Sequence, residues 1–439
     1  MILPDHLPTQ ISTIGTPRIT SPLSTQEPAS SRQPFIPETE RVLIDAHPGR
    51  LMERLDAGKP LLSFETAGPR EYIYFDPSKL NCALVTCGGL CPGLNDIIRS
   101  VVLELYFRYG VTHIHGIRYG LQGFIPAFGH EPLSLTPETV VDILNRGGSI
   151  LGSSRGAQDM GAIVDCLERM HIGILFMIGG DGTLKAASRI ADEIQARHLK
   201  ISVIGIPKTI DNDIHLVSRS FGFDTAVDVA TQAIRAAHNE AVGYPNGIGL
   251  IKLMGRHSGF LAATAALAQQ DVNFVLIPEV PFTLDGANGL LPALEKRLAH
   301  RHHAVIVVAE GAGQTFLEQN DRVDASGNAR LGDIGVYLKQ RITDYLSEKG
   351  IEHAVKYIDP SYIIRSLPAN ANDHVFCSFL GRHAVHAGMA GKTRMLVGHW
   401  NDQYVHLPME ASVGKRKHVD PDGSLWHAVC EATGQEAMI

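Results

Sequence analysis

The chain has 439 residues, 44% of them apolar, which is enough for two domains or for one large domain with lobes. Its formal net charge of −7 argues against a general nucleic-acid binder, although phosphate ligands need only a few local cations. No apolar run approaches the roughly 20 residues that span a bilayer, and the start MILPDHLPTQ lacks the regions of a secretory signal. We therefore expect a soluble protein without nucleic-acid or membrane partners.

The cysteines do not form a disulfide pattern. Cys87 and Cys91 flank glycines in CGGLC, and Cys82 lies inside an apolar run. No second ligand pair follows at the spacing typical of a zinc site. We expect reduced, partly buried thiols and a cytoplasmic location.

Residues 1–80 are interpreted as an N-terminal extension. The first 35 or so are rich in Ser, Thr and Pro and contain few large apolar groups, which is typical of a disordered or loosely attached tail. A helical stretch at Thr39–Leu55 and an extended segment at Glu71–Phe75 are predicted to follow.

From Asn81 onward, short apolar runs alternate with amphipathic stretches of helical length. Ile97, Val101 and Leu105, for example, recur every four residues, as on one helix face. The alternation predicts an α/β fold of βαβ units with mostly parallel strands, and the units are numerous enough for two such sheets. The predicted strands are Ala83–Thr86, Ile174–Ile178, Ser202–Ile206, Ile248–Leu253, Phe274–Ile277, Val305–Ala309 and Met395–Val397.

Ligands of open α/β sheets bind beyond the carboxyl ends of the strands, so the residues that follow each run are informative. The first run leads into Thr86–Asn95, TCGGLCPGLN, and then into a predicted helix. Glycines at this position let the main chain approach a phosphate at the positive end of the helix. A tight strand–helix turn without a ligand is the alternative.

The second loop is Gly179–Thr183, GGDGT. Asp181 could bind magnesium on a nucleotide, and the missing side chain at Gly182 leaves room for a triphosphate. NAD kinases and lipid kinases resemble this loop too, and a turn that only caps a helix is a further alternative.

The third loop, Pro207–Asp213, is the sharpest signal. Its sequence PKTIDND gives two carboxylates, a hydroxyl and a lysine directly after an apolar strand. Phosphoryl transfer needs a base, a metal anchor and cations for the transferred oxygens, and this loop has candidates for all three. A solvated polar turn is the alternative.

Cations follow several of the other runs. Arg155, Arg256 and Arg365 border glycines or close apolar runs, where arginine is well placed for bidentate phosphate contacts. Glu310, in AEGAG, could accept hydrogen bonds from sugar hydroxyls or cap a helix. The basic run Gly414–His418 is typical of a solvated loop, with a phosphate contact at a subunit or effector site as the alternative.

Taken together, the chain resembles the phosphofructokinase family from about Phe64 to Met409. Its motifs are closest to the plant- and trypanosome-type ATP enzymes, which also carry N-terminal extensions, rather than to the short bacterial type. The motifs occur in the family's order: GGLCPGLN, NRGGSILGSSRG, GGDGT, PKTIDND, FGFDTA, KLMGRHSGF, LIPEVPF, AEGAG and YIDPSYIIR.

The resemblance implies a role for each matching residue on the donor side. Asp181 would bind Mg²⁺, and Arg155 would bridge the donor and sugar phosphates. Lys208 would stabilise charge on the transferred phosphoryl group. The nucleotide phosphates would be lined by Gly89, Gly180, Gly182 and Thr183.

On the sugar side, the resemblance implies that Asp211 is the base that takes the proton of the 1-hydroxyl. Thr209 and Asp213 would help to hold substrate and metal. The sugar itself would contact Met254, Gly255, Arg256 and Glu310, and its 6-phosphate would contact Lys356, Tyr362 and Arg365.

The chain also departs from the short bacterial enzymes. Tyr362 stands where they have histidine, and Lys356 where they have arginine. Gly247 aligns with an arginine that they lend across a subunit interface. The family includes allosteric enzymes, but no effector site can be assigned from these residues.

Two residues indicate whether the phosphoryl donor is ATP or pyrophosphate. Pyrophosphate enzymes of the family usually have aspartate at the place of Gly182 and lysine at the place of Lys208. This chain combines the ATP-type glycine with the pyrophosphate-type lysine. Because an aspartate would intrude where the nucleotide's α-phosphate lies, we expect the glycine to decide, and ATP to be the donor.

The resemblance therefore implies an Mg²⁺-dependent 6-phosphofructokinase of glycolysis that forms fructose 1,6-bisphosphate from ATP and fructose 6-phosphate, as a homodimer or homotetramer. The alternatives are a pyrophosphate-dependent enzyme and a catalytically silent sensing subunit. We therefore expect an α/β fold of two Rossmann-like βαβ lobes with mostly parallel sheets and the active site in the inter-lobe cleft. The expected donor lobe spans residues 81–222 and 365–407 and the expected sugar lobe 223–364, with 408–439 as a C-terminal extension.

Overall fold

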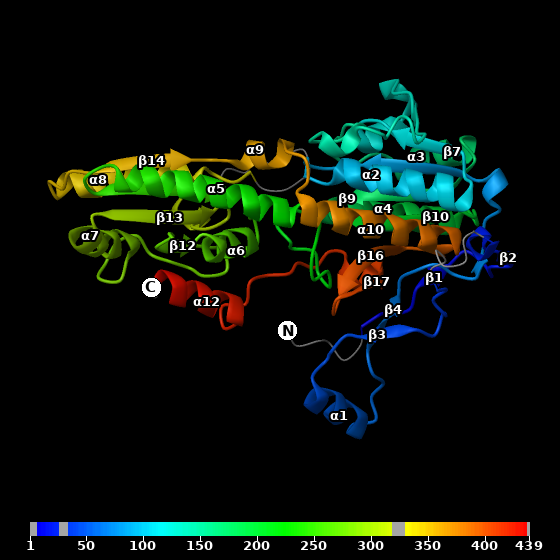
Figure 1. Ribbon diagram of the computed structural model, residues 1–439, viewed down its shortest axis with the longest axis horizontal. Helices are drawn as coiled ribbons and strands as arrows, with labels where there is room; N and C mark the ends of the chain where they lie inside the picture. Colours follow the sequence, from blue (N-terminus) through cyan, green and yellow to red (C-terminus); the bar gives the residue numbers. More distant parts are fainter. Residues whose placement is uncertain (1–6, 26–33, 318–329, 437–439) are drawn as a thin grey trace. The chain divides into compact units, whose positions relative to one another are not determined.

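The computed structural model describes residues 7–25, 34–317 and 330–436. The chain forms two compact units, which we call unit 1 and unit 2 and describe separately (Figure 1). Unit 1 comprises Met1–Thr209, Ile214–Gly222 and Leu367–Lys415. Unit 2 comprises Ile210–Asp213, Phe223–Ser366 and Arg416–Ile439.

Unit 1 is built on a nine-stranded sheet in the order β3-β4-β17-β16-β10-β9-β6-β7-β8. The five strands from β16 to β7 are parallel, and the strands outside them are antiparallel to their neighbours. The parallel strands read as continuous apolar runs because helices cover both faces of the sheet. The strands are β3 (Arg41–Leu43), β4 (Ser63–Thr66), β6 (Asn81–Thr86), β7 (His113–Ile117), β8 (Leu133–Ser134), β9 (Ile172–Gly179), β10 (Ser202–Pro207), β16 (Met395–Trp400) and β17 (Gln403–Pro408).

Successive side chains along each strand point to opposite faces of this sheet. Ala83 and Val85 belong to a core shared with α3 and α4, whereas Ile174 and Phe176 lie against Gly388 of α10. Helix α10 packs along α2 on that second face (Figure 1). The helices of unit 1 are α1 (Pro48–Asp56), α2 (Leu94–Leu103), which continues as a π-helix over Glu104–Tyr109, α3 (Met160–Arg169), α4 (Asp181–Ala196), α10 (Ala371–Met389) and α11 (Met409–Ser412).

The prediction of a disordered N-terminal tail is wrong for residues 7–25. Strand β1 (Ser12–Thr13) pairs with β15 (Lys392–Thr393), and β2 (Ile19–Thr20) pairs with β5 (Tyr72–Ile73). The few apolar side chains of this segment, Leu7, Ile11 and Leu23, are buried. The strand partners lie far away in sequence, so local composition did not reveal the pairing. Residues 1–6 and 26–33 of the predicted tail lie outside the described residues.

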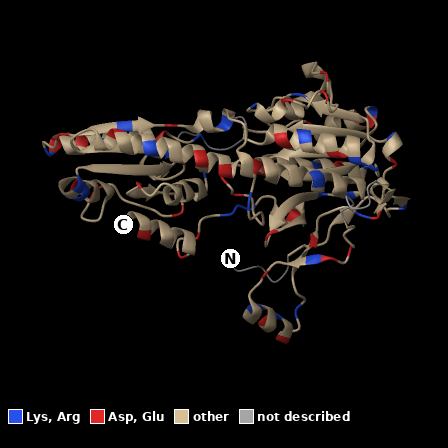
Figure 2. Ribbon diagram, viewed as in Figure 1, with Lys and Arg blue, Asp and Glu red and all other residues tan. Residues whose placement is uncertain are grey.

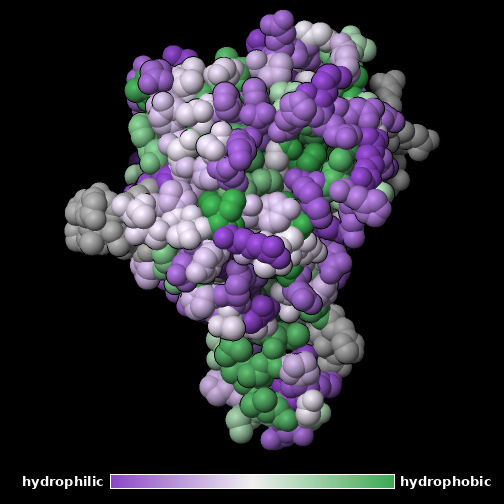
Figure 3. Space-filling view, turned by 90° about the vertical axis from the view of Figure 1, so that its right-hand side faces the viewer, coloured by the Kyte–Doolittle hydropathy of each residue, from purple (hydrophilic) through white to green (hydrophobic). Residues whose placement is uncertain are grey.

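The helical stretch predicted at Thr39–Leu55 is correct only in its second half. Residues Arg41–Leu43 form β3, and α1 begins at Pro48, which occupies the first helical position. Helix α1 buries none of its residues, and Met52 and Leu55 are exposed. Hydrophobic residues accordingly gather on the surface of the segment that carries α1 (Figure 3).

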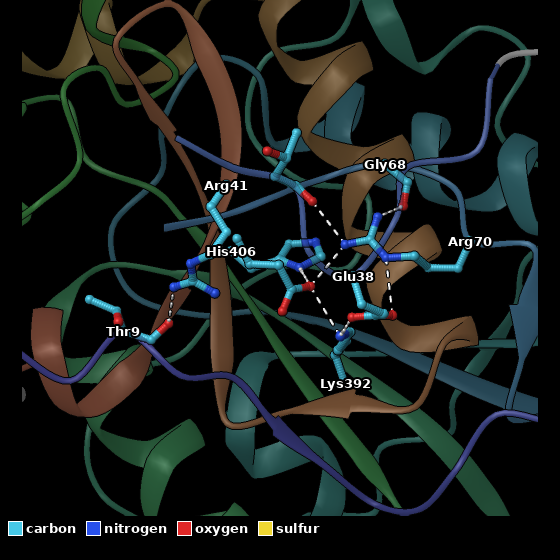
Figure 4. A network of polar contacts seen from close by, with 9 residues as sticks. Thr9, Glu38, Arg41, Gly68, Arg70, Lys392 and His406 are labelled. Atoms are coloured by element: carbon cyan, nitrogen blue, oxygen red, sulfur yellow. Dashed lines mark hydrogen bonds and ion pairs between the residues drawn. The ribbon is translucent and has the colours of Figure 1, made fainter. Parts of the chain in front are cut away.

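A buried ionic network ties the N-terminal segment to the end of unit 1 (Figure 4). Glu65 accepts from Arg70 at 2.8 Å, from Lys392 at 3.0 Å and from His406 at 2.9 Å, and all four side chains are buried. Glu38 contacts both Arg70 and Lys392. Although burial opposes it, the hydrogen bond from His406 and the nearby charges of Lys392 and Arg70 lower the pKa of Glu65. Paired in this way, the buried charges fix residues 38–70 against β15 and β17.

Unit 2 contains a four-stranded parallel sheet in the order β12-β13-β11-β14. One face packs on α7 and α8, and the other packs on α5 and α6. Helix α12 packs on α6 and β12. The elements are β11 (Gly247–Leu253), β12 (Phe274–Leu276), β13 (His303–Ala309), β14 (Ala354–Ile358), α5 (Phe223–Val242), α6 (Phe260–Ala268), α7 (Leu290–Arg301), α8 (Ile334–Glu348), α9 (Ser361–Ser366) and α12 (Ser424–Thr433).

Gly247 begins β11 where α5 approaches most closely. A Cβ atom added at this position would lie 2.0 Å from the carbonyl oxygen of Ala241. Any side chain would therefore displace main chain, so the glycine is a packing requirement of this unit.

The predicted α/β class, with mostly parallel sheets, is confirmed. The two units are unequal, because unit 1 has nine strands in its main sheet and unit 2 has four. Residues 210–213, expected in the donor lobe, belong to unit 2, and residues 408–439 divide between the units after Lys415. Residues 1–80, expected as a separate extension, belong to unit 1. None of the helices in the described ranges has both the length and the apolar composition needed to cross a membrane.

Candidate active site

The three glycine- and aspartate-rich loops of unit 1 begin at adjacent strand ends. In the sheet, Thr86 of β6 pairs with Ile178 of β9, and Gly179 of β9 pairs with Pro207 of β10. The loops after residues 86, 179 and 207 therefore leave the same edge of the sheet side by side. This is the edge where ligands bind in open α/β sheets.

The first loop is fixed by residues of the segment 146–155. The hydroxyl of Ser153 donates to the carbonyl of Gly88 at 2.6 Å, and the Gly88 N–H donates to the Ser154 carbonyl. Asn95 donates to the carbonyl of Arg146. These contacts place Arg155 beside Gly89, with 3.4 Å between its Nη2 atom and the position of a Cβ at that glycine. The motifs GGLCPGLN and NRGGSILGSSRG thus form one pair of loops, which carries the guanidinium group of Arg155.

Lys208 also reaches this loop pair. It is only 7% exposed, and its Nζ donates to the carbonyl of Gly89 at 2.8 Å. Its carbonyl oxygen lies 3.3 Å from the position of a Cβ at Gly180. The structure therefore groups Gly89, Arg155, Gly180 and Lys208, four residues to which the resemblance assigns donor-side roles. Thr209, which follows, is anchored through its carbonyl by the hydroxyl of Ser220.

Asp181 is the first residue of α4, with Gly180 as the N-cap. Its carboxylate is 17% exposed, accepts from the N–H of Gly414 at 3.0 Å and pairs with Lys185 at 2.7 Å. A Cβ added at Gly182 would have no atom within 4 Å, so open space faces this position. Thr183 is buried in the first helical turn. The helix end thus offers free space, a carboxylate and the positive end of its dipole.

In unit 2, Asp211 occupies an unusual electrostatic environment. Burial raises its pKa to about 7, and the neighbouring carboxylates of Asp213 and Glu310 add to the shift. Arg365 and a hydrogen bond from the main chain of Arg256 oppose it. A carboxylate whose pKa lies near neutral pH is suited to accept a proton at physiological pH.

Asp213 is fixed by the basic run that follows α11. Its side chain, 9% exposed, pairs with Arg416 at 2.6 Å, and its main-chain carbonyl accepts from the N–H of Lys417 at 2.8 Å. Burial lowers the pKa of Lys417 to about 8, and its Nζ lies 4.9 Å from the ring centre of Phe260. The interpretation of this run as a solvated loop is therefore wrong for Arg416 and Lys417.

The remaining sugar-side residues lie at neighbouring strand ends of unit 2. Leu253 of β11 pairs with Ala309 of β13, so Met254 and Glu310 follow adjacent strands. The Glu310 N–H donates to Leu253, and the Gly311 N–H donates to Gly255. Gly255 has a φ of 130°, a conformation that favours glycine. The loop pair places Arg256 and Glu310 around Asp211.

Arg365 and Tyr362 belong to α9, and Tyr362 is 80% exposed. Lys356 has other neighbours: its Nζ lies 3.9 Å from Glu240 and 4.3 Å from the ring centre of Tyr244. These two residues lie at the carboxyl-terminal end of α5 and just beyond it. Within unit 2 the structure thus groups Arg365 with Asp211 and gives Lys356 a separate environment.

Three residues that the sequence reasoning missed support these loops. Lys252 contacts Asp333 at 3.0 Å and Asp359 at 2.9 Å, which fixes the turn before α9. Glu279 accepts from the N–H groups of Gly259 and Val419. Arg416 pairs with Asp213. All three residues lay within stretches that the sequence analysis had singled out: Lys252 in KLMGRHSGF, Glu279 in LIPEVPF and Arg416 in the basic run Gly414–His418. Their partners lie far away in sequence, so these stretches alone did not reveal the contacts.

The two groups of residues suit different tasks. The unit 1 group offers main-chain N–H groups, two cations and a carboxylate, which suits a polyphosphate and its counter-cation. The unit 2 group offers a carboxylate with a pKa of about 7 and nearby arginines, which suits a phosphorylated polyol.

In the described part of the chain, no three His, Cys, Asp or Glu side chains come together as a metal cluster. Mg²⁺ bound to a nucleotide needs only one or two carboxylates, because phosphates and water complete its shell, and Asp181 fits that requirement.

Comparison with known proteins gives consistent matches. The family model described as phosphofructokinase matches residues 81–388. An ATP-dependent 6-phosphofructokinase of Borreliella burgdorferi is 48% identical over 98% of this chain and 97% of its own length. One of Trypanosoma cruzi is 43% identical, covering 92% of this chain and 83% of its own. Among solved structures, a pyrophosphate-dependent phosphofructokinase of Marinobacter aquaeolei aligns with a TM-score of 0.67 at 19% identity, over 82% and 92% of the two chains.

Proposed function

Because this chain belongs to the phosphofructokinase family, we propose that it transfers the γ-phosphoryl group of ATP to the 1-hydroxyl of fructose 6-phosphate. The product is fructose 1,6-bisphosphate. The chain is an enzyme, a kinase whose reaction is a step of glycolysis. The resemblance inferred from the motifs is confirmed by the family match and by the identity to curated relatives over nearly the whole chain.

The observation that carries the proposed chemistry is the environment of Asp211. Burial and two neighbouring carboxylates raise its pKa to about 7, so at neutral pH a large fraction is ionised and ready to accept a proton. Arg365 and the main chain of Arg256 oppose the shift and keep the ionised form accessible. A surface aspartate with an ordinary pKa would be ionised but a weak base.

In the proposed mechanism, Asp211 takes the proton of the 1-hydroxyl as the sugar oxygen attacks the γ-phosphorus in line. The bond from this phosphorus to the bridging oxygen of the β-phosphate breaks, and ADP leaves. Lys208 and Arg155 stabilise the negative charge on the transferred group. Arg365 binds the 6-phosphate, and Arg256 and Glu310 orient the sugar. Tyr362, Met254 and Gly255 complete the sugar side, and Thr209 and Asp213 help to hold it.

Asp181 is the proposed magnesium ligand. When bound with the nucleotide, Mg²⁺ would neutralise charge on the donor phosphates. The N–H of Gly414 and the ammonium of Lys185 orient the Asp181 carboxylate meanwhile. Lys185 is half exposed, so its ion pair is weak enough to be displaced.

ATP is the proposed donor because open space faces Gly182. Gly89, Gly180 and Thr183 are proposed to line its phosphates, as the resemblance implies. The names of the relatives at 47–48% identity support the same donor. Pyrophosphate is the second candidate, favoured by one observation: the buried Lys208 reaches the carbonyl of Gly89, where it suits a small, highly charged donor.

We propose further that the enzyme is a homo-oligomer, a dimer or tetramer, and that it acts in the cytoplasm. The oligomer follows from the family alone. All six cysteines carry free thiols, as a reducing compartment would maintain them.

The proposal is tested by measuring fructose 1,6-bisphosphate formation from fructose 6-phosphate and Mg²⁺, with ATP and pyrophosphate at equal concentration. We expect turnover with ATP and little with pyrophosphate. Turnover with pyrophosphate alone would contradict the donor assignment and leave the sugar side intact. Binding of both substrates without turnover would favour the silent sensing subunit.

A further inference from the structure

The segment Arg416–Val419, which we call the basic strap, lies against the loops of unit 2 that carry the proposed sugar site. Figure 2 shows the basic residues of this stretch as a blue run on the chain leading into α12. At one end, Arg416 pairs with Asp213 at 2.6 Å. At the other, the N–H of Val419 donates to Glu279 at 2.8 Å, and Glu279 also accepts from the N–H of Gly259. Between them, the imidazole of His418 bonds the carbonyl of His257 at 2.9 Å.

Asp213 is fixed at two points by consecutive strap residues. Arg416 bonds its carboxylate, and the N–H of Lys417 donates to its carbonyl oxygen at 2.8 Å. Its side chain is 9% exposed and that of Arg416 is 31% exposed, so the pair is largely shielded from water. A charge-assisted contact at 2.6 Å in such a place constrains orientation far more than a surface ion pair does.

The charges around Asp213 explain why orientation matters there. Asp213 and Glu310 both act on Asp211, so three carboxylates share one neighbourhood. The charge of Arg365 and a hydrogen bond from the main chain of Arg256 also act on Asp211. Without the Arg416 pair, the Asp213 carboxylate would face the like charge of Asp211 without the compensating charge of that guanidinium.

We propose that Arg416 is a positioning residue for the phosphoryl-transfer reaction, acting through its ion pair with Asp213. The proposal rests on the proposed function, because it concerns the efficiency of that reaction. Arg416 does not touch the reacting atoms; it fixes the carboxylate that neighbours the base and helps to hold substrate and metal. The C-terminal strap is thus part of the working site.

The first test compares kcat, the KM for fructose 6-phosphate and the half-saturating Mg²⁺ concentration of the full-length wild type and Arg416→Gln. We expect kcat to fall about 10- to 100-fold, as when an outer partner of a ligating or catalytic group is removed. The half-saturating Mg²⁺ concentration should rise, and Arg416→Lys should recover part of the loss. Arg341→Gln is the matched control, because it breaks the exposed pair of Arg341 with Asp285 at 3.0 Å in the same unit; it should leave kcat unchanged.

A double-mutant cycle separates positioning from general stability. If Arg416 acts through Asp213, Arg416→Gln should lower kcat little further in an Asp213→Asn background. An equal loss in both backgrounds would overturn the proposal, as would wild-type kcat in Arg416→Gln or an equal loss in Arg341→Gln. The Asp213→Asn/Arg416→Gln variant removes both charges together. If Arg416→Gln alone unfolds, comparing this double variant with Asp213→Asn still measures the effect of Arg416 in the Asp213→Asn background, and a further loss of about 10-fold in kcat there would overturn the proposal. A wild type without turnover would instead contradict the proposed function, and this inference with it.

Discussion

The proposed donor side, in unit 1, and the proposed acceptor (sugar) side, in unit 2, are built from different kinds of chemical group. The donor side is mostly main chain: glycine turns, helix N–H groups and carbonyls, with Ser153 and Asn95 tying the loops together. The acceptor side is mostly charged side chains gathered around Asp211. The first arrangement selects by space and fixed dipoles, and the second by the balance of charges. Substitutions should therefore act differently in the two regions.

The largest effect is expected on the acceptor side. Asp211→Asn should lower kcat by about 10²–10⁴-fold, because an amide cannot accept the hydroxyl proton. The dissociation constant for fructose 6-phosphate should change little. Steady-state kinetics with calorimetric sugar binding would check both, with the exposed Asp285→Asn as a control. Equal losses of binding and turnover would make Asp211 an anchor rather than a base.

On the donor side, Lys208→Ala should lower kcat by about 10²–10³-fold, the scale of losing one preorganised donor to transition-state charge. The KM for fructose 6-phosphate should stay near that of the wild type, because Lys208 belongs to the unit 1 group. The exposed Lys79→Ala is the control. A kcat that Lys208→Ala leaves unchanged would remove Lys208 from the mechanism.

The variant Gly182→Asp tests whether the open space at this position determines which phosphoryl donor the enzyme uses. A Cβ at this position meets no atom within 4 Å, so the variant should fold. A carboxylate there would face the nucleotide phosphates, and like-charge contacts of several kcal/mol correspond to a loss of about 10²-fold in kcat/KM for ATP. Gly182→Asn, which has the same shape without the charge, separates sterics from repulsion. An unaffected kcat/KM for ATP in both variants would show that Gly182 does not choose the donor.

A smaller effect is expected from pH. Burial, Asp213 and Glu310 raise the pKa of Asp211 to about 7, so the basic form is lost as the pH falls below that value. In the free enzyme, kcat/KM for fructose 6-phosphate should therefore fall about tenfold per pH unit on the acid side. Glu310→Gln removes one repelling carboxylate and should move this limb to lower pH. A limb near pH 4 in the wild type would contradict the electrostatic account of the acceptor side.

The same contrast governs what the sequence could predict. The donor loops were predictable, because a glycine turn between an apolar strand and a helix is a local pattern. On the acceptor side, single residues such as Arg256 and Arg365 were predicted from motifs, but the pairing of Arg416 with Asp213 joins positions far apart in sequence. The contacts of Lys356 with Glu240 and Tyr244 also join separate parts of the chain and were not predicted. The strands at residues 12–20 were missed for the same reason, because their partners lie far along the chain.

The central claim is that a phosphoryl group passes from ATP to the 1-hydroxyl of fructose 6-phosphate. Phosphorus NMR of a reaction containing the enzyme, ATP, Mg²⁺ and fructose 6-phosphate tests it most directly. The account predicts equal growth of ADP and of a second sugar phosphate ester, located on carbon 1. Release of free phosphate without a new ester, or an ester on another carbon, would contradict it.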